Sequence, residues 1–169
     1  MSWKRAKKVR VDADKGLYKK SHTTPMDQEY LDYHDYKEIS MCGILSTKKQ
    51  KYFIRPRYNE SFQHFFLVFE IADYLRKFTR KVCLYETVRP DIVFKIKGKE
   101  YAVEVETGKT LTNNKRRLLE KVKNLNKIYE DRWFFVVTNR VFTSRYKKFG
   151  KTFDKRNVAK KILDVIRCN

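Results

Sequence analysis

Apolar positions in the middle of the chain first follow a helical pattern and then a strand pattern. Residues 61–79 carry apolar side chains on nearly every face of a helix, which predicts a buried helix. Short runs rich in β-branched and aromatic residues follow at 82–85, 91–96 and 101–106, and these runs predict strands. Gly98 and Lys99 lie between the last two strands and predict a two-residue hairpin turn.

The last third of the chain predicts two helices around a buried strand. Thr112 is the expected cap of a helix whose apolar residues recur at helical spacing: Leu118, Val122, Leu125 and Tyr129. The continuous apolar run at 133–137 predicts a buried strand, parallel to an inner neighbour. An irregular basic loop is expected at 140–153, and a final helix capped by Asp154. The order α-β-β-β-α-β-α predicts an α/β domain over 61–169, with a central mixed sheet flanked by helices.

The first 60 residues predict a small basic appendage. Residues 1–22 lack a sustained period and are expected to form an arm. Thr24, Pro25 and Asp27 predict the start of a helix over 26–40, and residues 43–58 a hairpin with Lys48 and Lys49 at its tip. A helix and a basic hairpin are typical of the end of a winged helix, but also of any small α/β appendage, so both readings stay open.

Composition bounds the class of protein. A chain of 169 residues fits one domain with a short appendage, and 41% hydrophobic residues are enough for a core. The net charge of +20 favours nucleic acid as partner, against a generally basic protein or one that binds anionic lipid. The basic excess lies in residues 1–60 and 107–169, whereas 61–106 is nearly neutral. An acidic centre between phosphate-binding surfaces would have this distribution.

The cysteines and the apolar runs point to the inside of a cell. Cys42, Cys83 and Cys168 are widely spaced and predict free thiols in a reducing, cytoplasmic compartment. A zinc site of Cys42 with His22 and His34 lacks the usual close ligand spacing. With no signal-like N-terminus and no apolar run long enough for a membrane span, we expect no membrane partner.

Three carboxylates are expected on one face of the central hairpin. If Gly98 and Lys99 form the turn, Asp91 pairs with Glu106, and Glu104 lies on the same face because side chains alternate along a strand. Facing like charges destabilise a sheet unless a cation compensates, and oxygen ligands suit Mg²⁺ or Mn²⁺. The alternative is a solvated outer face on which Lys95 and Lys97 neutralise the acids.

These residues resemble the motif of the PD-(D/E)XK nuclease superfamily. The resemblance covers residues 61–138 and rests on Arg89-Pro90-Asp91, then Glu104-Val105-Glu106, with Glu70 on a preceding helix. It implies a restriction-endonuclease-like core of order α-β-β-β-α-β, with a metal held by Asp91, Glu104 and Glu70. From the residues alone, Glu70 could instead be ion-paired with a nearby arginine.

This sequence differs from the family motif at the position of the family's lysine. Glu106 occupies its position, as in BamHI-type restriction enzymes, so Glu106 is expected as a metal ligand or general base, with Lys109 as the candidate cation. The run 101–109 also resembles replication-relaxation proteins of mobile elements, which implies plasmid, phage or virus origin.

The sequence therefore predicts a Mg²⁺- or Mn²⁺-dependent DNA endonuclease, with a homodimer left open. The side chains expected to contact phosphates are basic: Lys48, Lys49, Lys115, Arg116, Lys123, Arg140, Arg145, Lys147 and Lys148. One rival is a non-catalytic DNA-binding or relaxosome accessory module on the same fold. The second rival is an RNA-binding or RNA-cleaving protein, which the high aromatic content favours.

Overall fold

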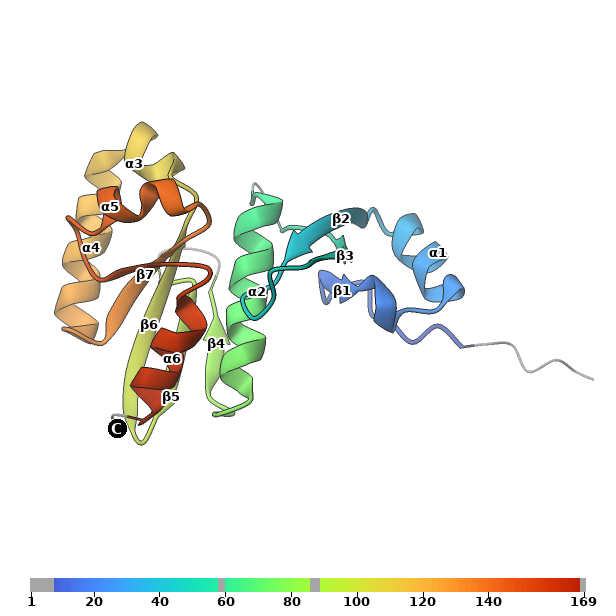
Figure 1. The fold of residues 1–169 in the computed structure, drawn as a ribbon, viewed down its shortest axis with the longest axis horizontal. Helices are drawn as coiled ribbons and strands as arrows, with labels where there is room; N and C mark the ends of the chain where they lie inside the picture. Colours follow the sequence, from blue (N-terminus) through green and yellow to red (C-terminus); the bar gives the residue numbers. More distant parts are fainter. Residues whose placement is uncertain (1–7, 58–59, 86–88, 168–169) are drawn as a thin grey trace, which may run out of the picture. The chain divides into compact units, whose positions relative to one another are not determined.

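The computed structural model describes residues 8–57, 60–85 and 89–167 (Figure 1). It divides into two compact units, residues 1–62 and 63–169. We had expected a division at 60/61.

The first unit is a three-stranded antiparallel sheet with one α-helix (Figure 1). The strands lie in the order β1-β3-β2, and the small core joins Leu31, Tyr36 and Phe53. The bounds of its elements are β1 Leu17–Lys19, the 3-10 helix η1 Lys20–His22, α1 Pro25–Tyr33, β2 Lys37–Cys42 and β3 Lys49–Ile54.

Helix α1 begins where the sequence predicted and ends early. Thr24 and Asp27 form a capping box, with Pro25 in the first turn, which confirms the predicted start. The predicted end at residue 40 is wrong: the helix stops at Tyr33, Asp35 takes a positive φ of 62°, and Lys37–Cys42 forms strand β2 against β3. A six-residue ladder of strand hydrogen bonds therefore replaces the last turns of the expected helix.

The hairpin and the arm also differ from expectation. Residues 43–48 connect β2 to β3, so Lys48 lies in the loop but Lys49 begins β3, and the first strand of the hairpin ends before residue 43, where the predicted hairpin was to begin. Within the expected arm, Leu17–Lys19 forms β1 at the edge of the sheet, and residues 1–7 lie outside the described residues.

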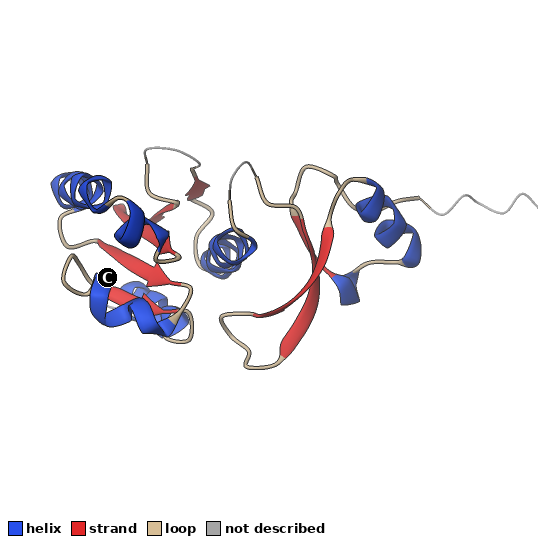
Figure 2. Ribbon diagram, turned by 90° about the horizontal axis from the view of Figure 1, so that it is seen from above, coloured by secondary structure: helices blue, strands red, loops and turns tan. Residues whose placement is uncertain are grey.

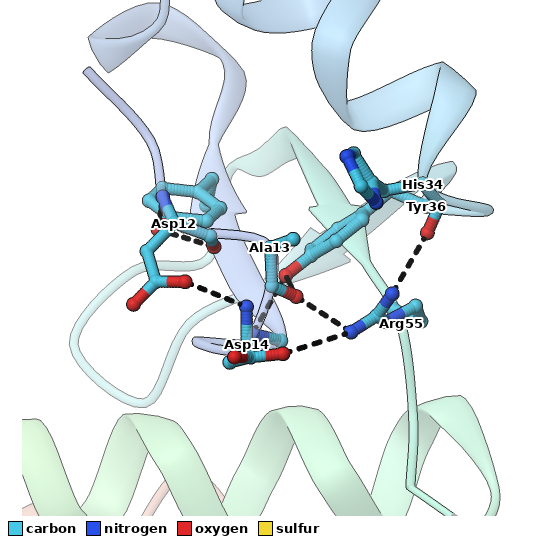
Figure 3. A network of polar contacts seen from close by, with 8 residues as sticks. Asp12, Ala13, Asp14, His34, Tyr36 and Arg55 are labelled. Atoms are coloured by element: carbon cyan, nitrogen blue, oxygen red, sulfur yellow. Dashed lines mark hydrogen bonds and ion pairs between the residues drawn. The ribbon is translucent and has the colours of Figure 1, made fainter. Parts of the chain in front are cut away.

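Polar contacts fasten the segment before β1 to the rest of this unit (Figure 3). Arg55 donates hydrogen bonds to the carbonyl oxygens of Ala13 at 2.6 Å and His34 at 3.1 Å. The Tyr36 hydroxyl donates to the same Ala13 oxygen and accepts from the Gly16 amide, both at 2.8 Å. The segment 13–16 is thus held in place, because the side chains of Tyr36 and Arg55 form hydrogen bonds with its backbone carbonyl and amide groups.

The second unit is a mixed five-stranded sheet flanked by helices (Figures 1 and 2). The strand order is β4-β5-β6-β7-β8, antiparallel from β4 to β6 and parallel from β6 to β8. The elements are α2 Phe62–Arg76, β4 Val82–Leu84, β5 Ile92–Ile96, β6 Lys99–Glu106, α3 Lys109–Asn113, α4 Lys115–Tyr129, β7 Trp133–Val137, η2 Arg140–Phe142, α5 Thr143–Tyr146, β8 Thr152–Asp154 and α6 Val158–Arg167.

The mixed α/β class and the parallel pairing of β7 with β6 confirm two predictions. Two others are wrong. The expected irregular loop at 140–153 contains η2, α5 and the start of the fifth strand β8, and Asn114 rather than Thr112 caps α4, by accepting from the Arg117 amide at 3.0 Å. The three-residue strand β8 is too short to leave a periodic signal in the sequence.

Helices α4 and α5 pack on one face of the sheet. A core on this face joins alternate residues of β5, β6 and β7 to the two helices: Val93, Ala102, Leu118, Leu125, Tyr129, Trp133, Phe135, Val137 and Tyr146. Because strand side chains alternate, Glu104 and Glu106 follow Ala102 onto this covered face. The expected carboxylates are therefore buried, at 2% and 4% exposure, and the alternative of a solvated outer face is wrong.

Candidate active site

The β5–β6 turn fixes the register of the carboxylates. Ile96 pairs with Lys99 and Ile92 with Val103, so the turn is Lys97-Gly98, with φ of 44° and 86°, and the predicted Gly98-Lys99 turn is wrong by one residue. Two positive φ values are the requirement of a type I′ turn, and its twist suits a hairpin. Moving the turn by one residue shifts every pair by two positions, so each side chain keeps its face while its partner changes.

Asp91 lies one residue before β5 and reaches across to β6. The observed register, continued by one residue, places it opposite Glu104 rather than Glu106. Its Oδ2 accepts a hydrogen bond from the Val105 amide at 2.7 Å, and Nε2 of His64 on α2 lies 3.4 Å from the same oxygen. The Asp91 side chain is 16% exposed, so it is the more accessible of the two facing acids.

Glu104 is a buried carboxylate paired with a lysine that the sequence analysis did not select. Its Oε1 accepts a hydrogen bond from Nζ of Lys121, and its Oε2 is buried with no hydrogen-bond partner among the described residues. Burial raises the pKa of Glu104 well above its ordinary value, the charge of Asp91 raises it further, and Lys121 acts in the opposite direction. Asp91, Glu104 and Lys121 thus form one electrostatic group.

Glu106 has a different environment two residues along β6. Its Oε2 accepts a buried hydrogen bond from the Tyr146 hydroxyl at 2.9 Å. Burial raises the pKa of Glu106, while the hydrogen bonds from Tyr146 and Thr110 oppose that rise. Burial raises the pKa of Tyr146 beyond its usual range, and the neighbouring charge of Glu106 raises it further. This phenol therefore stays protonated and remains the donor.

Lys121 lies among the apolar residues of α4. It follows Leu118 by three residues and precedes Leu125 by four, so it falls on the stripe that packs against the sheet. The pKa of Lys121 is raised although burial lowers it, because Glu104, Asp91 and Glu106 together outweigh the desolvation. A lysine on the apolar stripe of an amphipathic helix is the signal that could have identified it from the sequence.

Two further expected site residues, Lys109 and Glu70, lie on α3 and α2. Lys109 is exposed at the first position of α3, and the cation that contacts the carboxylates is Lys121. Glu70 is half-buried on α2, and at 3.6 residues per turn it lies about 120° around that helix from His64, which makes the contact to Asp91.

Gly108 sets the path of the chain directly after the carboxylate strand. Its φ is +92°, and a Cβ added there would lie 2.5 Å from the Phe142 ring. Phe142 therefore packs directly on the glycine backbone, just before α5 carries Tyr146 to Glu106. The glycine is required both for its backbone conformation and for this close approach.

The expected phosphate-binding side chains are all exposed, which leaves them available to a polyanion: Lys48, Lys49, Lys115, Arg116, Lys123, Arg140, Arg145, Lys147 and Lys148. Arg116 makes an ion pair with Glu120 at 3.2 Å. A groove of about 680 Å³ beside β8 and α6 brings Lys147 together with Lys151, Lys160 and Lys161, which we had not selected.

Within residues 8–57, 60–85 and 89–167, no three His, Cys, Asp or Glu side chains are arranged to hold a metal ion, which covers both the Glu70–Asp91–Glu104 set and the zinc alternative. Asp91 and Glu104 remain as a pair of adjacent acids, one with a buried oxygen that lacks a donor. Cys42 and Cys83 are free thiols, and Cys168 lies outside the described residues.

No helix in the described part of the chain is long and apolar enough to cross a membrane. Comparisons with protein-family models, with curated proteins and with solved structures found no match.

Proposed function

We propose that this protein is a metal-dependent DNA endonuclease built on a restriction-endonuclease-like core. The observation that carries the proposal is the group formed by Asp91, Glu104 and Lys121: Asp91 lies directly before β5, Glu104 is buried on the neighbouring β6, and a lysine is held against them. Buried carboxylates with perturbed pKa values beside a specific charge partner are typical of functional sites. The order of elements from α2 to β7 follows the order expected for that core.

Asp91 and Glu104 would hold the Mg²⁺ or Mn²⁺ ion. Carboxylate oxygens are the ligands such ions prefer, and the donorless Oε2 of Glu104 is suited to accept one. When bound, the ion would act as a Lewis acid that polarises the phosphate and makes a bound water more acidic.

The protein's own groups have separate roles in this proposal. Lys121 balances the charge of Glu104 and places an ammonium group where negative charge develops during phosphodiester hydrolysis. The Val105 amide and His64 fix the orientation of Asp91. Glu106, whose Oε2 is engaged by Tyr146, positions the end of β6 instead of acting as the general base. In this proposal the role of the family lysine falls to Lys121 of α4 instead of to a residue of β6.

The net charge of +20 and the exposed basic residues of the second unit support a polyanionic substrate. The first unit, with its exposed Lys48 and Lys49, would add affinity for DNA. Mobile-element origin and action as a homodimer remain part of the proposal.

The test is cleavage of linear, supercoiled and single-stranded DNA in Mg²⁺, in Mn²⁺ and in a chelator. Wild type should cut in the metal buffers alone. Asp91→Asn should lose cleavage and keep DNA binding, because the amide still accepts from Val105 but has lost its charge. Asp73→Asn, at an exposed position of α2, is the matched control and should cut normally.

The second candidate is a non-catalytic DNA-binding module on the same fold, for which the ion pair between Lys121 and Glu104 is the supporting observation. A lysine that already neutralises the buried acid leaves the group stable without an added cation. Tight DNA binding with no cleavage in either metal would favour this candidate. Cleavage of RNA but not DNA would favour the ribonuclease alternative.

A further inference from the structure

A pocket of about 430 Å³ lies beside the carboxylate group on the same unit. Among its lining residues are Tyr85 and Arg89, which lie between β4 and β5, and four residues of α4: Lys121, Asn124, Ile128 and Tyr129. The volume falls within the range of about 300–1,000 Å³ that holds small organic groups.

The lining of this pocket combines aromatic faces with polar groups. Tyr85 is half-buried and has the Arg89 guanidinium 4.9 Å from its ring centroid, and Tyr129 is 7% exposed. Burial raises the pKa of Tyr129, and the charge of Arg89 opposes that rise, so the cation lies within electrostatic range of both phenols. Planar π systems and guanidinium groups are the surfaces on which nucleobases stack.

Two of the exposed lining residues carry groups that fit the edge of a base. Asn124 is exposed and offers both an amide donor and a carbonyl acceptor, and Glu100 adds an acceptor. Ile128 is 62% exposed, which is a large apolar surface to leave in water at a pocket rim. An aromatic compound with hydrogen-bonding edges would cover it.

Lys121 connects this pocket to the proposed active site. It lines the pocket and at the same time donates to Oε1 of Glu104. Glu104 and Glu106 are buried beneath α4 and α5, so Asp91 and Lys121, at 16% and 23% side-chain exposure, are the accessible members of the group. A nucleotide that approaches those two side chains would have its base next to Tyr85 and Tyr129.

We propose that this pocket binds one unpaired nucleobase of the DNA substrate, stacked on Tyr85 and held by Arg89, while the adjoining phosphate lies at Lys121. The inference rests on the proposed function and deepens it, because it assigns the enzyme a single-stranded or locally opened substrate. Extruding a base from a duplex breaks its stacking and pairing, so an already unpaired base is bound at a lower cost.

The experiment compares two labelled oligonucleotides of equal length and charge, one a normal single strand and the other a backbone of abasic residues. Affinities are measured by fluorescence anisotropy with the full chain in chelator, so that binding is read without cleavage. Wild type should bind the normal strand at least about tenfold more tightly, which corresponds to about 1.4 kcal/mol and is typical of stacking one base.

Variants of the stacking residue assign the preference to the pocket. Tyr85→Ala should lower the ratio towards one without changing affinity for the abasic strand, Tyr85→Phe should keep it, and Tyr85→Leu, which preserves apolar packing, should lose it. Phe78→Ala, at an aromatic position that is 41% exposed and outside the pocket, is the matched control and should keep the ratio.

Equal affinity of wild type for the two strands would overturn the inference even if Mg²⁺-dependent cleavage is observed. A base preference that survives Tyr85→Leu would overturn it as well. A third outcome would assign the pocket to a second copy of the chain and overturn the inference. In that case wild type shows no base preference but self-associates in sedimentation, and Tyr85→Ala abolishes the self-association. Failure of the proposed function is measured separately, as the absence of cleavage in the metal buffers. If such an inactive protein still prefers the normal strand, the assignment of the pocket to a nucleobase is supported.

Discussion

Lys121 of α4 is ion-paired with Glu104 of β6, and both side chains lie between the helix and the sheet. The pair joins residues 17 positions apart in sequence. It brings the one cation that contacts the buried acid, among the described residues, from a helix instead of from the carboxylate strand.

Removing this cation should affect stability and activity separately. Lys121→Met should abolish Mg²⁺-dependent cleavage and cost about 3 kcal/mol of unfolding free energy, because it leaves Glu104 buried without its cation. The double variant Lys121→Met/Glu104→Gln should recover most of the stability but no cleavage. Lys127→Met, at an exposed position of the same helix that has no proposed role in the site, is the control. Denaturant titration and cleavage assays measure both effects, and full activity of Lys121→Met would contradict the assigned role.

The raised pKa of Glu106 predicts a specific pH dependence of stability. The folded protein binds the Glu106 proton more tightly than the unfolded chain does, so this contribution is complete below the ordinary pKa of 4.5 and is lost as pH rises through the folded-state value. Glu106→Gln cannot ionise and still offers Tyr146 an acceptor. Its melting temperature should therefore exceed that of wild type at alkaline pH, and the difference should shrink as the pH falls towards 4.5. Glu120→Gln, at an exposed carboxylate, should show no such difference.

The hydroxyl of Tyr146 should stabilise the fold through Glu106. Tyr146→Phe should cost about 1.5–3 kcal/mol of unfolding free energy at neutral pH, because a buried carboxylate oxygen loses its donor. In a double-mutant cycle with Glu106→Leu the cost should fall, since the partner is gone. Tyr33→Phe, at a tyrosine that is 84% exposed, should change stability little. Equal costs of Tyr146→Phe in both backgrounds would show that the hydroxyl acts elsewhere.

Two glycines with nearly equal φ angles separate backbone strain from close packing. Gly98→Ala should cost about 1–2 kcal/mol, because its φ is +86° and no atom lies within 4 Å of the added Cβ. Gly108→Ala should cost more, since a Cβ there meets the Phe142 ring at 2.5 Å in addition to the strain. Phe142→Ala should remove the excess when combined with Gly108→Ala. Thermal melting of the variants provides the comparison.

The lysine groove beside β8 and α6 should contribute to DNA affinity through phosphates. Lys160→Ala/Lys161→Ala should make the slope of log affinity against log salt shallower by about 1.8, at about 0.9 for each neutralised phosphate of duplex DNA. Lys77→Ala/Lys81→Ala removes the same charge at exposed positions around the end of α2 and should leave the slope nearly unchanged. Equal effects of the two pairs would mean that net charge alone determines binding.

Local sequence determined the elements that have strong periodicity or caps. The apolar helix α2, the strands β5, β6 and β7, and the amphipathic helix α4 all follow from spacing, and the capping box at Thr24 fixed the start of α1. Alternation along the hairpin also determined that Asp91 and Glu104 share a face, because a turn displaced by one residue shifts the pairing by two and preserves the faces.

Only the tertiary structure decided which groups meet. The choice of Lys121 over Lys109 and the contact of His64 with Asp91 depend on how α4 and α2 pack on the sheet. The pairing of Tyr146 with Glu106 joins residues 40 positions apart, and no local pattern encodes that distance. The strand at Lys37–Cys42 replaced the expected helix because pairing with β3 outweighed helical propensity. Local spacing thus specifies faces and periods, whereas partners are selected by long-range packing.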